Sequence, residues 1–341
     1  MDIKLKTIDN VNFITLENSC GMEVVLCTIG ASFYELKLPD KNNVKESIIL
    51  TPSNLSDFYP SYYGKCIGRF SGRIDKGRCE INGKTYELDI NWGGVSSLHG
   101  GFDGLSSQNF AYDIEVSDKY TDVIFTYLEK EKILPGDVEY RFVYRVMEDS
   151  NDINLTFNAT TTKDTVVNLT NHVYFNLSGD GKRDVTEQKL QFLCDKYTRL
   201  NNELITESID PVNEVMDFRE IHEIGDFIND ESLQNHTAKG YDHCWIKEDL
   251  NNPVIAVMKD DESGRKLTVS TSYPAIVCYS CCYPDSYPFN EKKFNIHKFY
   301  SICVECQYVP NGINMDGVDK AILREGEEYN HYIHYHFDVE E

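Results

Sequence analysis

Residues 153–160 have the sequence Ile-Asn-Leu-Thr-Phe-Asn-Ala-Thr, in which apolar and polar side chains alternate one by one. Apolar or aromatic residues also recur at every second position in 123–127, 140–146 and 332–339. A period of two places the apolar side chains of each stretch on one face of a β-strand. Turn signals such as Pro135-Gly136 separate these stretches. The pattern predicts a succession of strands that each bury one face.

Helical periodicity is scarce in this chain. Ile221, Ile224 and Ile228 recur at helical spacing, which predicts one helix near 219–228, and a short helical turn is expected at 53–58. Because strands do not alternate with helices, a parallel sheet is excluded. No repeat, low-complexity stretch or linker divides the sequence. We therefore expect one domain over residues 1–341, an all-β fold built as a large antiparallel β-sandwich with few short helices.

Charge limits the class of partner. The chain has 341 residues, and 33 Lys and Arg stand against 56 Asp and Glu, for a net charge of −23. Such a field repels nucleic-acid phosphates and anionic membranes, so we expect neither as a partner. A small neutral substrate fits best.

The start of the chain carries no targeting pattern. Residues 1–6 alternate charge and apolarity and predict a first strand, and no apolar run is long enough to span a membrane. The expectation is a cytoplasmic protein, monomeric or homodimeric.

Eleven cysteines, an odd number, indicate reduced thiols in a reducing compartment. Two Cys-x-x-Cys pairs, Cys278 with Cys281 and Cys303 with Cys306, have a spacing close to that of a four-cysteine zinc site. Both pairs lie in strand-like runs, where residues three apart face opposite sides. The pattern favours buried structural cysteines, and no metal site is expected.

Other sequence motifs exclude two further kinds of chemistry. Residues 98–101 (Leu-His-Gly-Gly) are similar to the oxyanion segment of lipases, but the chain has no Gly-x-Ser-x-Gly elbow. Glycine-rich nucleotide motifs are also absent, so no cofactor is expected.

Several charged residues stand in strand-like or turn-rich surroundings. His172 lies in an aromatic run, Glu305 in an apolar one, and Asp242 follows Gly-Tyr. Arg69 and Arg73 lie in a glycine-rich stretch. A charge buried between strands costs free energy unless it is paired, so each of these residues is either half of an ion pair or part of a site.

Taken together, five motifs resemble the aldose 1-epimerase (galactose mutarotase) family. They are 68–74 (Gly-Arg-Phe-Ser-Gly-Arg-Ile), 98–101, 171–177 (Asn-His-Val-Tyr-Phe-Asn-Leu), 240–243 (Gly-Tyr-Asp-His) and 304–307 (Val-Glu-Cys-Gln). They occur in the order of the family.

The resemblance implies a sugar cleft on the concave face of a large antiparallel β-sandwich, without metal or cofactor. It assigns the general acid to His172 and the general base to Glu305. The residues that it implies for holding the sugar or placing protons are Arg73, His99, Tyr174 and Asp242. His243 is expected to be structural, because neighbours on a strand face opposite sides.

These residue types suit the reaction that the resemblance implies. Opening a pyranose ring requires a proton given to the ring oxygen and a proton taken from the C1 hydroxyl, which an imidazolium and a carboxylate can do near neutral pH. The freed aldehyde rotates about C1–C2 and closes on its other face. We expect a nearby carboxylate to raise the pKa of His172, and partial burial to raise the pKa of Glu305.

Three stretches depart from the family pattern, at 91–97, 310–314 and 278–282, and they leave the preferred sugar open. A hexose-6-phosphate 1-epimerase is the nearest alternative activity. It would need a phosphate site, for which the candidate residues are Lys65, Arg69, Arg73, Lys76 and Arg78. A non-catalytic sugar-binding protein on the same scaffold is a further alternative. A glycosidase would need paired carboxylates, whereas the expected pair is His with Glu.

Overall fold

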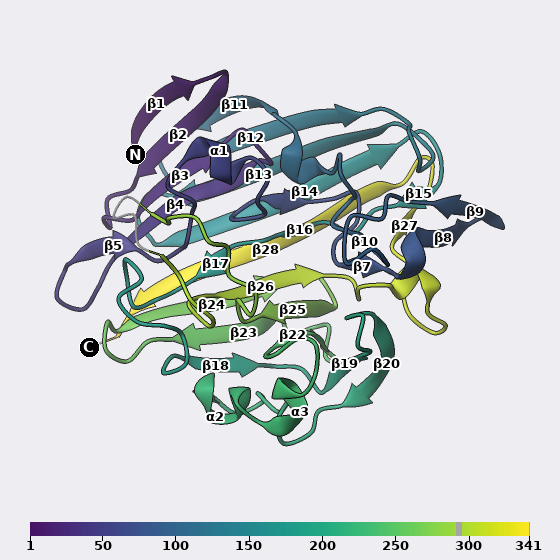
Figure 1. The fold of residues 1–341 in the computed structure, drawn as a ribbon. Helices are drawn as coiled ribbons and strands as arrows, with labels where there is room; N and C mark the ends of the chain where they lie inside the picture. The colour runs from purple at the N-terminus through teal and green to yellow at the C-terminus, as the bar shows by residue number, and fades with distance from the viewer. Residues whose placement is uncertain (291–294, 341) are drawn as a thin grey trace.

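The structure, a computed structural model, describes residues 1–290 and 295–340. Its largest element is a nine-stranded antiparallel sheet that runs the length of the molecule (Figure 1). In spatial order its strands are β11 (Ala111–Val116), β12 (Tyr120–Glu129), β13 (Val138–Met147), β14 (Asp152–Thr161), β28 (Glu328–Val339), β24 (Arg265–Thr271), β23 (Val254–Lys259), β18 (Lys189–Phe192) and β21 (His222–Glu223).

Two smaller antiparallel sheets pack on it. The five-stranded sheet consists of β1 (Asp2–Ile8), β2 (Val11–Glu17), β3 (Glu23–Cys27), β4 (Ser32–Pro39) and β5 (Lys45–Ser47). The six-stranded sheet has the order β17 (Tyr174–Phe175), β26 (Ile302–Gln307), β25 (Ala275–Tyr279), β22 (Asp242–Ile246), β19 (Lys196–Leu200) and β20 (Thr206–Pro211). All three sheets contribute side chains to the same core cluster, which makes the molecule a sandwich.

The alternation in the sequence accounts for this core. On β14, Ile153, Leu155 and Phe157 are fully buried, while the polar residues between them are half-buried. β13 follows the same rule and pairs with β14 so that Phe142 lies opposite Phe157. Burial of such large side chains is the dominant stabilising contribution. The predicted all-β antiparallel sandwich with few short helices is confirmed, whereas a single domain over 1–341 stays a prediction.

Four two-stranded ribbons and a few short helical turns complete the fold. The ribbons are β6 (Cys66–Ile67) with β16 (Thr170–Asn171), β7 (Arg73–Ile74) with β10 (Ser97–Leu98), β8 (Arg78–Ile81) with β9 (Lys84–Glu87), and β15 (Thr165–Val166) with β27 (Ile322–Leu323). The helical turns are α1 (Leu55–Phe58), α2 (Gly225–Ile228), α3 (Glu231–Gln234), η1 (Asp75–Gly77), η2 (Leu105–Ser107) and η3 (Gly312–Asn314). Within the described chain none of the helices could span a bilayer.

The helix predicted at 219–228 is wrong in extent. His222 and Glu223 instead form β21, which pairs with β18, and only Gly225–Ile228 is helical. Ile224 and Ile228 are buried as expected, but Ile221 is 43% exposed. Sheet pairing therefore overrides the helical spacing of the three isoleucines.

The sandwich leaves one face of the six-stranded sheet free for a site. On β26, Ile302, Val304 and Cys306 point into the core cluster. Since successive strand residues face opposite sides, Glu305 and Gln307 point the other way, into a cavity that both residues line.

Candidate active site

The cavity has a volume of about 420 Å³ and lies over the outer face of the six-stranded sheet. A cavity of this size suits a small organic molecule. Its lining includes every site residue expected from the sequence, namely Arg73, His99, His172, Tyr174, Asp242 and Glu305. The structure thus brings together residues from β7, β17, β22, β26 and the segments next to β10 and β16.

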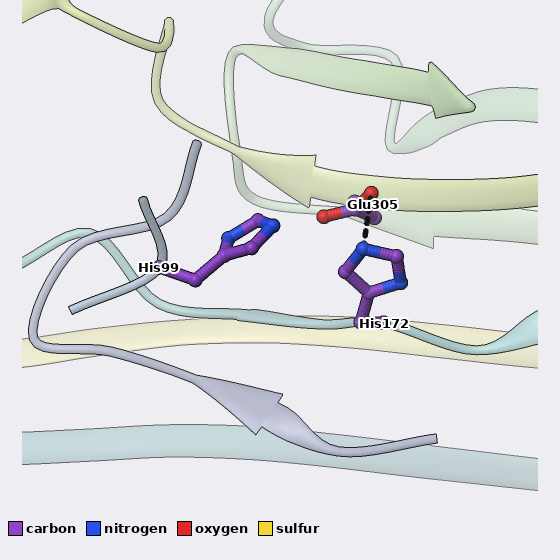
Figure 2. Close-up of side chains that lie close together, drawn as sticks. All are labelled: His99, His172 and Glu305. Carbon is purple, nitrogen blue, oxygen red and sulfur yellow. Dashed lines mark ion pairs between the residues drawn. The ribbon is translucent and has the colours of Figure 1, made fainter. Parts of the chain in front are cut away.

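His172 and Glu305 form the centre of the site. His172 Nε2 lies 3.4 Å from Glu305 Oε1, and both side chains are almost completely buried. Figure 2 shows the two side chains facing each other, with His99 beside them. The imidazole of His172 stacks on Tyr174 at 4.9 Å between ring centroids, and its Nδ1 lies 3.4 Å from Cys303 Sγ. The ring is therefore held on several sides with Nε2 toward the carboxylate.

The backbone around His172 is fixed by the ribbon of β6 and β16. The amide of His172 donates to the carbonyl of Lys65 at 2.8 Å, and the amide of Gly64 donates to the carbonyl of His172 at 2.9 Å. Asn171 Nδ2 donates to the carbonyl of Gly64 at 2.9 Å. This set of hydrogen bonds places the imidazole without using its ring atoms.

His99 reaches the cavity from the turn after β10. The amide of Gly72 donates to His99 Nδ1 at 3.2 Å, which leaves the ring proton on Nε2. Gly72 has a φ of +73°, and a Cβ there would lie 2.6 Å from a Pro310 side-chain atom, so only glycine fits. Burial lowers the pKa of His99 well below its usual value, with the charges of His172 and Arg73 acting in the same direction. His99 is thus a neutral donor.

Arg73 and Asp242 form an ion pair in the cavity wall. Arg73 Nη2 lies 3.1 Å from Asp242 Oδ2, and the side chains are only 13% and 9% exposed. The guanidinium also lies 4.9 Å from the ring centre of Trp92. Arg73 Nε has no hydrogen-bond partner among the described residues and remains able to donate to a ligand.

Four residues that line the cavity were not predicted as site residues from the sequence. Tyr62 stacks over His172, Trp92 packs on Arg73, and Tyr279 and Gln307 extend the floor. Gln307 lies two residues after Glu305 on the same strand, so period-two reasoning was enough to find it. Trp92 lies within the stretch 91–97 that departs from the family pattern, and no motif pointed to it.

Comparison with known proteins places this geometry in context. The family model for aldose 1-epimerase matches residues 12–336. The chain belongs to the aldose 1-epimerase family.

Individual relatives have moderate sequence identity to this chain. The chain is 30% identical to the aldose 1-epimerase of Escherichia coli (strain K12) over 340 residues, covering 96% of this chain and 95% of the relative. It is 29% identical to the galactose mutarotase of Mus musculus over 323 residues, covering 93% and 92%. A solved aldose epimerase homologue from C. elegans has a TM-score of 0.87 at 25% identity, covering 97% of this chain and 100% of that one.

The protonation of the central pair in this epimerase-family chain differs in part from expectation. Burial raises the pKa of Glu305 well above its usual value, and the charge of Asp242 adds to this while Arg73 opposes it. The expected rise in the pKa of His172 is wrong. Burial lowers the pKa of His172 to about 3, and the positive charge of Arg73 acts in the same direction. Removal of the imidazolium from water outweighs its attraction to the carboxylate.

Both shifts have one cause, since burial disfavours charge on either partner. The burial of both side chains therefore favours a neutral imidazole and a protonated carboxyl over the ion pair. The two arrangements differ only by one proton moved between the facing atoms of Glu305 and His172. The pair can donate a proton at one atom and accept one at the other without changing its net charge.

The same side chains have the spacing of a metal site. Ligand atoms of His99, His172 and Glu305 lie within 4.8 Å of one another, the one such group among residues 1–290 and 295–340. The expectation of a metal-free site thus stays a prediction. The Cys-x-x-Cys pairs do not converge, because Cys278 and Cys306 belong to one core cluster and Cys281 and Cys303 to another.

The basic residues proposed for a phosphate site are dispersed. Lys65 is fully buried and its Nζ donates to a backbone carbonyl, while buried Arg69 pairs with the last carboxylate of β12 at 3.1 Å. Lys76 and Arg78 are exposed and pair with neighbouring carboxylates. Only Arg73 of the five lines the cavity.

His243 was expected to be structural. Its ring packs near Tyr197 and Trp245, and its Nδ1 accepts from the amide of Asp242. It also borders the cavity, so its role stays a prediction.

Proposed function

We propose that this protein interconverts the α and β anomers of a free aldose such as galactose or glucose, by acid–base ring opening and closure. The observation that carries the proposal is the buried His172–Glu305 pair, 3.4 Å apart inside the cavity of an aldose 1-epimerase family fold. Ring opening needs one group that donates a proton and a second group nearby that accepts one.

In this mechanism the pair acts as one unit. With sugar bound, the proton held by Glu305 moves to His172, which creates an imidazolium opposite a carboxylate. The imidazolium then gives a proton to the ring oxygen while Glu305 takes the proton of the C1 hydroxyl, and the ring opens. After rotation about C1–C2, the two groups reverse their roles and the ring closes on the other face.

The surrounding residues hold the sugar in place. The Nε2–H of His99 donates to the ring oxygen or a neighbouring hydroxyl. Arg73 and Asp242 grip hydroxyl groups from the side wall, and Tyr174 supports the face of His172. Because the sugar replaces water around the pair, these contacts strengthen the electrostatic interactions on which the proton transfers depend.

The alternatives find less support. A sugar 6-phosphate would need a concentrated positive site, and of the candidate cations only Arg73 reaches the cavity, where Asp242 already pairs with it. A glycosidase needs two free carboxyl groups, and Asp242 is again engaged by Arg73. A protein that merely binds sugar would not need a buried carboxyl group with a raised pKa beside an imidazole.

Polarimetry on freshly dissolved α-D-galactose and α-D-glucose tests the proposal. The purified protein should shorten the relaxation toward equilibrium rotation in proportion to its concentration. Galactose 6-phosphate and glucose 6-phosphate serve as matched substrates. Faster mutarotation of the phosphorylated sugars alone would establish the phosphosugar alternative. Binding of sugar without any acceleration of mutarotation would establish the non-catalytic alternative.

Finer properties follow the same reasoning. We place the protein in the cytoplasm, where its thiols stay reduced, since all eleven cysteines are free. The net charge of −23 opposes binding to nucleic acid. A monomer or a homodimer suffices, because every residue assigned here comes from one chain.

A further inference from the structure

Gln307 is a buried amide whose polar atoms are unpaired within the part of the chain that the structure describes. It is 0% exposed, lines the cavity, and shares a strand face with Glu305. Neither its Oε1 nor its Nε2 has a hydrogen-bond partner among the described residues. Most side chains of this kind are paired in folded proteins, so an orphaned amide calls for a specific explanation.

The side chains across the sheet from Gln307 are apolar and cannot form hydrogen bonds with its amide. Ala275 lies opposite it on β25. Ala275 belongs to an apolar cluster with Cys244, Val277 and Val309. A buried polar group without a partner destabilises the protein, because it has lost its hydrogen bonds to water without replacement. A ligand hydroxyl, which both donates and accepts, would remove that cost.

The order of residues along β26 indicates which hydroxyl this is. His172 lies over the Cys303 end of the strand, since its Nδ1 is 3.4 Å from Cys303 Sγ. Glu305 follows, and Gln307 comes next, roughly 6.6 Å further along the same face. In a pyranose the ring oxygen, C1 and C2 are consecutive. If His172 faces the ring oxygen and Glu305 the C1 hydroxyl, Gln307 lies on the C2 side.

We propose that Gln307 binds the C2 hydroxyl of the aldose and makes the enzyme select for sugars that carry it. The inference rests on the proposed function, because it takes the direction of the sugar from the acid–base pair. Its chemical basis is the asymmetry of polar recognition: a substrate that lacks the hydroxyl leaves the buried amide unpaired.

The test compares D-galactose, 2-deoxy-D-galactose and 6-deoxy-D-galactose on wild type and Gln307→Met, with the uncatalysed rate subtracted. Methionine has nearly the length of glutamine and cannot form these hydrogen bonds. Gln191→Met, on β18 away from the cavity, is the matched control. Gln307→Ala is a second variant should the methionine fail to fold.

Wild type should prefer galactose over the 2-deoxy sugar by about tenfold or more in kcat/KM. Gln307→Met should bring that ratio to within about twofold of unity and leave the ratio for the 6-deoxy sugar unchanged. An unaltered 2-deoxy ratio in the variants, or an equal loss for all three sugars, would overturn the proposal.

A separate readout keeps the two proposals distinguishable. Trp92 lines the cavity, so its fluorescence reports sugar binding without any turnover. If wild type does not mutarotate galactose, the proposed function fails. The dissociation constants of the same sugars then test the role of Gln307 alone. Weaker binding of 2-deoxy-D-galactose than of D-galactose by wild type, and equal binding by Gln307→Met, would support it, whereas the same difference in both proteins would overturn it.

Discussion

Replacing Glu305 by Gln separates the contribution of the carboxylate to chemistry from its contribution to packing. The amide keeps the shape of the carboxyl group in a position that is only 2% exposed. It cannot take the proton of the C1 hydroxyl, nor pass a proton to His172 across the 3.4 Å between them. Binding groups elsewhere in the cavity are untouched.

The expected loss follows from the role of the base. General acid–base catalysis contributes about 10²–10⁴-fold, or roughly 3–5 kcal/mol of transition-state stabilisation. We therefore expect kcat for galactose mutarotation to fall by that factor with a modest change in KM. His172→Asn should lose a comparable amount. The double variant should be far less than multiplicatively worse, because the pair acts as a unit.

Stability provides the control. The pKa of Glu305 is raised in the folded protein. Folded wild type therefore loses stability as pH rises from about 4.3, the pKa of an unfolded Glu, toward the raised pKa of Glu305 in the folded protein. Gln lacks this loss, so Glu305→Gln should melt no lower than wild type at pH 8, and the difference should shrink toward pH 5. Glu139→Gln, exposed on β13, should change neither activity nor this pH dependence.

Polarimetry at saturating galactose and thermal melts at pH 5 and 8 check both parts. A Glu305→Gln protein that is folded, binds galactose and turns over near the wild-type rate would remove the base from the mechanism. Asp242 would then be the next carboxylate to examine.

Three further expectations concern binding, metal and pH. Arg73→Ala should chiefly raise KM for galactose, by about tenfold or more, since the guanidinium holds the sugar in ground and transition states alike; a loss confined to kcat speaks against this role. Mutarotation should persist in EDTA, whereas activity lost on chelation and restored by zinc would give His99, His172 and Glu305 a metal to hold. Burial lowers the pKa of His243 to about 3. Between pH 7 and pH 5 the free energy of unfolding, measured in urea, should therefore fall by about 2 kcal/mol more for wild type than for His243→Asn. An equal fall in both proteins would refute this expectation.

The sandwich was predictable because apolar side chains alternate with polar ones along strands such as β14 and β28. Burial on β14 follows the alternation in its sequence residue by residue. The failure at 219–228 has a long-range cause. The backbone of His222 and Glu223 finds hydrogen bonds on β18, more than thirty residues earlier in the chain, and such pairing leaves no trace in local periodicity.

The sequence predicted several of the residues that line the cavity, but it did not predict the pKa of His172. Motifs identified the residues whose side chains meet in the cavity, and the strand parity of β26 explains why Glu305 faces it. The pKa of His172 depends on how completely the cavity excludes water, which follows from packing by residues such as Tyr62 and Tyr174. A charged neighbour can be inferred from sequence, whereas desolvation of this extent requires the assembled cavity.

The central claim is that His172 and Glu305 exchange the anomers of a free aldose. Proton exchange spectroscopy on equilibrated D-galactose observes that exchange directly, through cross-peaks between the two anomeric protons. Wild type should produce cross-peaks that grow with enzyme concentration, and equal amounts of folded Glu305→Gln or His172→Asn should produce almost none. A folded wild-type protein that yields no enzyme-dependent exchange with galactose or glucose would contradict the account.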